Sequence, residues 1–80
     1  MSSFKAFVND KGKIYTIMLT ELALKHLNEQ ILQVTHSAHA EDVLAAIMDE
    51  EENCIETDEN VIRAFKKDTV YLTVQFRSSF

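Results

Sequence analysis

Apolar residues recur along the chain with two different periods, and the first stretch has the pattern of a β-hairpin. Residues 4–8 and 13–19 are rich in aromatic and β-branched side chains, which favour strands. Residues 9–12, with the sequence Asn-Asp-Lys-Gly, suit a tight turn because Asn bonds backbone amides and Gly adopts positive φ without steric cost. A type I turn with a glycine bulge would place Val8 opposite Ile14.

A helical period follows the hairpin and predicts a helix that begins after Thr20. Its buried stripe would consist of apolar residues spaced by three and four, namely Leu24, Leu27, Ile31 and Val34. Poor helix formers at residues 35–37 interrupt this pattern, and Ser37 can cap a second helix, whose C-terminal end would hold residues 49–52. The apolar face of the second helix would consist of Val43, Leu44, Ile47 and Met48. One long bent helix is the alternative.

The last third of the chain contains one clear strand and one ambiguous segment. Apolar and polar residues alternate over residues 69–76, which predicts a strand. Residues 61–65 fit a helix, with acids before it and bases after it, or a strand paired with residues 69–76. Their β-branched and aromatic side chains favour the strand, and residues 54–57 would add another. Whether residues 53–66 are strand or helix stays open.

Together these elements predict a single α+β domain over residues 1–80. The hairpin and the C-terminal strand or strands would form a small antiparallel sheet with the two helices on one face. The core face of the sheet would carry Phe4, Ala6, Val8, Ile14, Met18, Val70, Leu72, Val74 and Phe76. The opposite face would carry the apolar residues Phe7, Tyr15, Ile17 and Tyr71. We expect this face to self-associate into a homodimer, with partial cover by the chain termini as the alternative.

Charge changes the picture because it is distributed unevenly. Eight basic residues against 13 acidic ones give a net charge of -5, and residues 41–60 hold nine acids and no base. The candidate protein-binding residues are seven of these acids, Asp49, Glu50, Glu51, Glu52, Glu56, Asp58 and Glu59. Negative charge is unfavourable at the C-terminal end of a helix, where the first four would lie. We therefore expect them to dock on a basic partner protein, with a purely solvating role as the alternative.

Residues with catalytic or metal-binding chemistry are few. His36 and His39 have the spacing of two metal ligands on a helical turn, but no second cysteine completes a zinc pattern. We expect both histidines to be polar residues of a connection. The single cysteine, Cys54, cannot form an internal disulfide. The acids around it disfavour a reactive thiolate, so we expect a buried structural cysteine rather than a nucleophile. With one glycine the chain has no phosphate-binding loop, so we expect no cofactor and no enzymatic activity.

The expected function is that of a small acidic, non-enzymatic protein-binding module, as in an adaptor, an inhibitor or a regulatory subunit. One alternative is an acidic nucleic-acid mimic that inhibits a DNA- or RNA-handling enzyme. Another is a single-stranded nucleic-acid binder that uses the aromatic and basic side chains of the sheet, although the net charge disfavours nucleic acid as a partner. No apolar run suits a membrane span or a signal peptide, so we expect a soluble, cytoplasmic protein.

Overall fold

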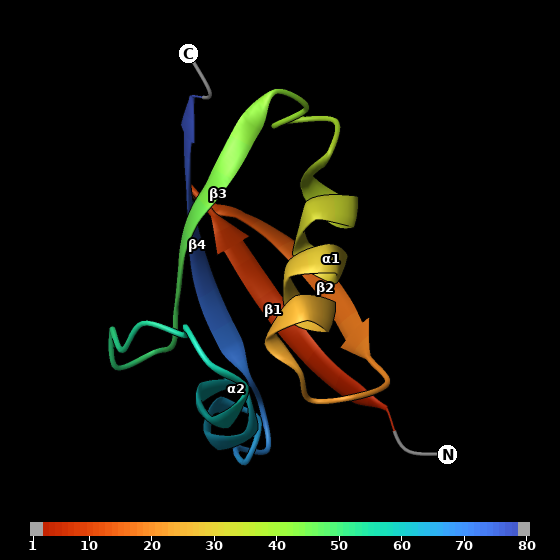
Figure 1. The fold of residues 1–80 in the computed structure, drawn as a ribbon, viewed down its shortest axis with the longest axis vertical. Coiled ribbons are helices and arrows are strands. Elements are labelled where there is room, and N and C mark those ends of the chain that lie inside the picture. Colours follow the sequence, from red (N-terminus) through yellow and green to blue (C-terminus); the bar gives the residue numbers. More distant parts are fainter. Residues whose placement is uncertain (1–2, 79–80) are drawn as a thin grey trace.

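The computed structural model describes residues 3–78, which form a four-stranded mixed sheet and two helices (Figure 1). In chain order the elements are β1 (Phe4–Asp10), β2 (Lys13–Leu19), α1 (Leu24–Thr35), β3 (Asp42–Met48), α2 (Asp58–Ala64) and β4 (Tyr71–Ser78). The strands lie in the order β2-β1-β4-β3. The predicted α+β fold, with an N-terminal hairpin and a C-terminal strand in one sheet, is confirmed.

The sheet is mixed because β4 inserts between β1 and β3. The pairs β1–β2 and β3–β4 are antiparallel, whereas β1 and β4 are parallel. After the hairpin the chain crosses one face as α1, forms the far edge as β3 and returns to the centre as β4 (Figure 1). The antiparallel pairing expected for the whole sheet therefore holds for the two outer pairs only.

The hairpin turn is a two-residue loop rather than a type I turn with a bulge. Lys11 and Gly12 both have positive φ, at 52° and 93°, and the Gly12 amide donates a hydrogen bond to Asn9 Oδ1 at 2.8 Å. Positive φ at both loop residues matches the right-handed twist of the flanking strands. Val8 consequently faces Tyr15, and the predicted pairing of Val8 with Ile14 is wrong.

This shift of one residue exchanges the two faces of β2. Tyr15, Ile17 and Leu19 belong to the core face, where Ile17 is only 2% exposed. Ile14 and Met18 point the other way and are 56% and 46% exposed. The assignment of Ile14 and Met18 to the core, and of Tyr15 and Ile17 to the outer face, is therefore wrong.

Helix α1 buries the expected apolar stripe but begins later than its predicted start after Thr20. Leu27 and Ile31 are fully buried against the sheet. The residue before the helix gives no side-chain cap, and the Leu24 amide instead donates a hydrogen bond to Asp58 Oδ1 at 2.8 Å. A carboxylate from α2 thus caps the N-terminus of α1.

Residues 42–48 form strand β3, so the predicted second helix is wrong, as is the alternative of one long helix. The strand pairs with β4, with a bulge between Leu44 and Ala46, while Ile47 is buried in the core. Leucine and alanine favour a helix locally. Pairing with β4 prevails because it satisfies backbone groups along that strand and buries one face of the segment.

Residues 58–64 form helix α2, so the favoured strand over residues 61–65 is also wrong. The Asn60 amide donates to Thr57 Oγ1 at 3.1 Å, and the Thr57 amide donates to Asn60 Oδ1 at 3.2 Å. This capping box, together with acids in the first turn and a base in the last, starts a helix despite the β-branched residues that follow. Of the predicted strand over 54–57, an isolated bridge between Cys54 and Met48 is present.

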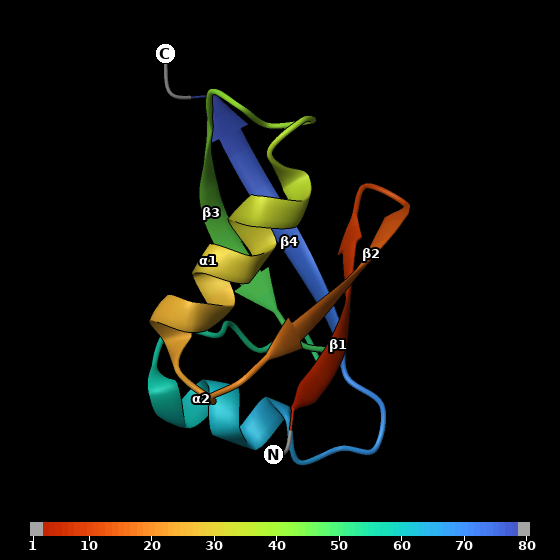
Figure 2. The ribbon, with the colours of Figure 1, turned by 90° about the vertical axis from the view of Figure 1, so that its right-hand side faces the viewer.

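Both helices contribute to one core on a single face of the sheet (Figure 2). The buried apolar residues are Ala6, Val8, Ile17, Leu19, Leu27, Ile31, Ile47, Ile55, Val61, Ala64, Phe65, Val70, Leu72 and Val74. Helix α2 closes the core near the start of β1, where the rings of Phe4 and Phe65 meet edge to face. Neither helix of the described residues is long and apolar enough to span a membrane. We call the opposite side of the sheet, which no helix between residues 3 and 78 covers, the open face.

Candidate functional site

Two stacked aromatic rings occupy the centre of the open face. Phe7 of β1 and Tyr71 of β4 are register partners on the two central strands, with ring centroids 5.3 Å apart and planes inclined by 23°. The Lys5 ammonium lies 5.1 Å from the centroid of the Phe7 ring, within cation–π range. Tyr71 is 50% exposed, so the stack presents aromatic surface to the surroundings.

The other side chains of the open face are apolar, polar without charge, or basic. Alternation along β1, β2 and β4 places on it Lys5, Phe7, Asn9, Ile14, Thr16, Met18, Tyr71, Thr73, Gln75 and Arg77. These described residues include no acid, although the chain carries a net charge of -5. Of the predicted self-association residues, the structure brings Phe7 and Tyr71 together and places Tyr15 and Ile17 on the core face.

The acids after β3 form a tight turn, not the end of a helix. In this acidic turn, residues 49–53, Asp49 Oδ1 accepts hydrogen bonds from the amides of Glu51 and Asn53, each at 2.9 Å, and Glu52 has a φ of 65°. Partial burial opposes ionisation of Asp49, but the amides of Asn53 and Glu51 hold its pKa below the usual value. The acids therefore oppose no helix dipole, and Asp49 is required by the turn itself.

We expect Asp49→Ala to lower the free energy of unfolding by about 1 kcal/mol, because two turn amides lose their acceptor. Asp49→Asn keeps one acceptor oxygen and should recover most of this loss. Glu50→Ala, a neighbouring exposed acid, should cost less than about 0.5 kcal/mol. Urea unfolding followed by circular dichroism measures all three variants. Equal stabilities of Asp49→Ala and Glu50→Ala would contradict the structural role of Asp49.

The other predicted protein-binding acids are spread between the acidic turn and α2, and two of them have partners within the chain. Glu51 pairs with Lys67 at 3.3 Å, and Asp58 caps α1 through the Leu24 amide. The remaining exposed acids are Glu50, Glu52, Glu56 and Glu59. Glu51 and Asp58 thus already make contacts within the chain, and these contacts compete with binding to a partner.

A cleft of about 110 Å³ connects the acidic turn with the open face. Its lining includes Glu50 and Glu51 from the turn, Arg63 from α2, Lys67 from the following loop and Tyr71 from β4. Tyr71 therefore shares this cleft with carboxylates of the acidic turn and with the cations Arg63 and Lys67. A partner that covers Tyr71 also meets the acidic turn.

A second cluster, which the sequence pattern does not reveal, holds His39 between two carboxylates. His39 Nδ1 lies 2.7 Å from Asp42 Oδ2, and Nε2 lies 2.6 Å from Asp10 Oδ2. The imidazole stacks on Phe76 with ring centroids 3.9 Å apart. The hydrogen bond to Asp42 raises the pKa of His39, as does Asp10, although burial opposes the charged form. Because an ionised carboxylate only accepts, the doubly protonated imidazolium is the form of His39 that can donate to both, and we call these three side chains the ion triad.

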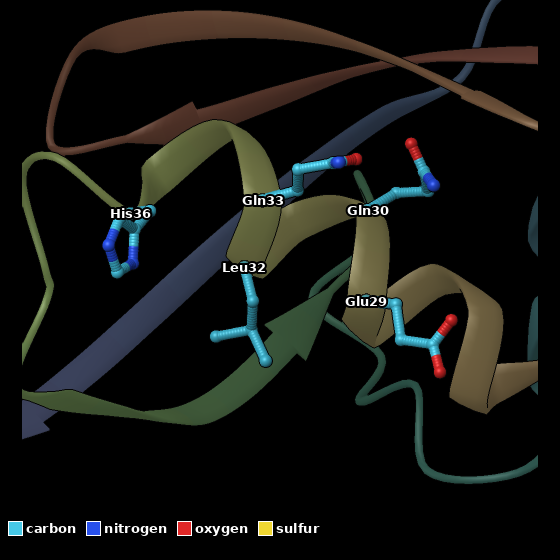
Figure 3. A pocket seen from close by; sticks show the side chains of 5 residues that line it. All are labelled: Glu29, Gln30, Leu32, Gln33 and His36. Atoms are coloured by element: carbon cyan, nitrogen blue, oxygen red, sulfur yellow. The ribbon is translucent and has the colours of Figure 1, made fainter.

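The two histidines considered as metal ligands have different surroundings. Both ring nitrogens of His39 are engaged by carboxylates, while His36 lines a shallow groove on α1 with Glu29, Gln30, Leu32 and Gln33 (Figure 3). Across the described residues, no group of three or more His, Cys, Asp or Glu side chains has an arrangement that could hold a metal ion. The ion triad had a partial signal in the sequence, the His39-x-x-Asp42 spacing, but Asp10 lies far away in the chain.

Cys54 is exposed, so the expectation of a buried structural cysteine is wrong. The neighbouring Ile55 takes the buried position, and its amide donates a hydrogen bond to the Ile47 carbonyl at 2.8 Å. The segment therefore turns one apolar side chain inward and leaves the thiol outside.

Comparison of the chain with models of protein families, with curated proteins and with solved structures finds no match. Function is therefore inferred from the open face, the acidic turn and the ion triad. Of these three, the ion triad uses its hydrogen-bonding groups internally, whereas the open face leaves an aromatic stack uncovered.

Proposed function

We propose that this chain is a non-enzymatic protein-binding module whose contact surface is the open face. The observation that carries the proposal is the exposed Phe7–Tyr71 stack at the centre of a helix-free sheet face. Exposed apolar surface of this kind marks association sites, and aromatic residues near the centre of an interface contribute most of its energy. An adaptor, an inhibitor and a regulatory subunit all act in this way.

The charges around the stack indicate the chemistry of the partner. Lys5 and Arg77 on the open face favour acidic groups, whereas the acidic turn beside Tyr71 favours basic ones. The complementary surface is a protein surface with an apolar centre and charges of both signs at its rim, basic where it meets Glu50 and Glu51. The acidic turn is therefore still expected to contact basic groups of the partner, but only at the rim of the interface.

Nucleic acid is a poorer fit to the same face. Aromatic side chains on a sheet can stack with bases, and the Phe7–Tyr71 pair has suitable geometry. However, a phosphate backbone that reached Tyr71 would approach the carboxylates of the acidic turn, where Lys67 is already paired with Glu51. A nucleic-acid mimic is also disfavoured, because Asp49 and Asp58 are committed to backbone amides.

Site-specific photo-crosslinking tests this proposal in the cell of origin. A benzophenone amino acid replaces Tyr71 in one chain and Leu32 in another; Leu32 lies on α1, away from the open face, and is similarly exposed at 43% against 50%. We expect protein adducts from position 71 that position 32 does not give, and we expect Glu50→Lys with Glu51→Lys to reduce them.

Two results would count against the proposal, and a third would remove the acidic turn from the interface. Equal labelling from positions 71 and 32 would mean that the open face is not a preferred contact surface. Adducts from position 71 that consist of RNA or DNA would support the nucleic-acid alternative instead. Adducts that depend on position 71 but not on Glu50 and Glu51 would exclude the acidic turn from the interface while retaining the face.

A further inference from the structure

Strand β2 forms an edge of the sheet that lacks the usual protection against pairing. Its seven residues pair with β1 without a bulge, and its only charged side chain is that of Lys13. The opposite edge, β3, begins with Asp42 and contains a bulge between Leu44 and Ala46. Long, regular and uncharged edges invite a further strand, whereas bulges and charges discourage one. The two edges lie at opposite ends of the strand order β2-β1-β4-β3.

The hairpin geometry determines which backbone groups of β2 face outward. A two-residue loop is closed by a hydrogen-bonded pair, here Asp10 and Lys13, and hydrogen-bonded pairs then alternate along the ladder. Every second residue of β2, counted from Lys13, therefore bonds to β1. The amides and carbonyls of Ile14, Thr16 and Met18 point instead toward the free edge.

We propose that two copies of this chain pair antiparallel through β2 about a two-fold axis at Thr16, which joins their sheets into one of eight strands. Thr16 then faces Thr16 of the second copy, and Ile14 faces Met18 of the second copy. Each of the three outward-facing residues then belongs to a hydrogen-bonded pair between the copies. Three such pairs with two hydrogen bonds each give about six hydrogen bonds. A shift to an axis at Tyr15 or Ile17 would retain fewer of these pairs.

Side-chain complementarity identifies a second copy as the occupant of this edge. In the proposed register Ile14 and Met18, which are 56% and 46% exposed in one chain, cover each other across the junction. Lys13 faces Leu19, and no like charges are paired. The strand is thus complementary to itself in a single register.

This dimer uses the edge of the sheet and leaves the Phe7–Tyr71 stack uncovered, so the inference does not rest on the proposed function. The two-fold axis runs perpendicular to the sheet, and both aromatic stacks therefore lie on the same side of the joined sheets. Light scattering of the full chain should give twice the chain mass of 9.2 kDa at concentrations where the dimer forms.

Charge at position 16 tests the register directly. Thr16→Lys and Thr16→Glu each place like charges across the axis and should raise the dimer dissociation constant at least about tenfold. An equimolar mixture of the two variants should restore association, because unlike charges then face each other. Thr73→Lys and Thr73→Glu, at an exposed position of β4 on the open face, are matched controls that should leave the dimer unchanged.

A thiol at the axis gives a second measurement that does not depend on charged variants. In a Cys54→Ser chain, Thr16→Cys should form a disulfide-linked dimer under mild oxidation, whereas Thr73→Cys should not. A monomeric wild-type chain at all concentrations, or a dimer that survives Thr16→Lys, would overturn the proposal. Loss of the dimer in the Thr73 variants alone would place the contact on the open face and would also overturn it.

Discussion

We expect Ile17→Ala to lower the free energy of unfolding by about 2–4 kcal/mol and Ile14→Ala to lower it by less than about 1 kcal/mol. The two isoleucines lie on the same strand, three residues apart, and differ in the face to which they belong. Ile17 is 2% exposed in the core, whereas Ile14 is 56% exposed on the open face. Removing the Ile17 side chain leaves a cavity, and removing that of Ile14 changes mainly contacts with water.

Chemical denaturation at low protein concentration measures this difference without a contribution from self-association. The comparison also tests the two-residue loop, since the predicted bulged turn would bury Ile14 and expose Ile17. A larger loss for Ile14→Ala than for Ile17→Ala would therefore restore the predicted register and overturn the observed one. Similar losses for both variants would indicate a hairpin without a fixed register.

The hairpin itself was predictable, but its register was not, and the reason lies in β2. Both alternate sets of its residues are apolar, with Ile14 and Met18 in one set and Tyr15, Ile17 and Leu19 in the other. Alternation therefore could not decide which set is buried. The turn decides it, through a positive φ at Lys11 that a lysine side chain gives no reason to expect.

The predictions for residues 42–48 and 61–65 are wrong because the local secondary-structure preference of each segment differs from the structure that its surroundings impose. Residues 42–48 contain leucine and two alanines and favour a helix locally. They form β3 because they pair with β4 through backbone hydrogen bonds. Residues 61–65 are β-branched and aromatic, yet a capping box between Thr57 and Asn60 starts a helix there. Only the capping pair was visible in the sequence.

The candidate site was predictable to the extent that it depends on alternation. Phe7 and Tyr71 lie on strands with clear alternation, and the structure brings them together as neighbours. The prediction that Tyr15 and Ile17 lie beside them is wrong because the predicted hairpin register differs from that of the structure by one residue. The ion triad could not be predicted from the sequence, because Asp10 and His39 come together only when the hairpin and the loop before β3 fold against each other.

The ion triad should make stability depend on pH in a direction that its geometry determines. Asp42 and Asp10 raise the pKa of His39 in the folded state above its unfolded value, with burial opposing them. The folded state therefore binds the His39 proton more tightly than the unfolded state does. The stabilisation is complete below the unfolded pKa of about 6.5 and is lost as pH rises through the raised folded pKa.

We expect His39→Ala to lower the free energy of unfolding by about 2–4 kcal/mol near pH 6, because it leaves the 7%-exposed Asp10 without its cation and removes the stack on Phe76. Between pH 6 and alkaline pH the difference from the wild type should shrink, because the wild-type imidazole becomes neutral as pH rises through its raised folded pKa. Denaturant unfolding across this range measures it. His36→Ala, in the exposed groove of α1, is the matched control and should leave the pH profile unchanged. A His39→Ala difference that is constant with pH would mean that His39 stabilises the fold by packing on Phe76 and not by its charge.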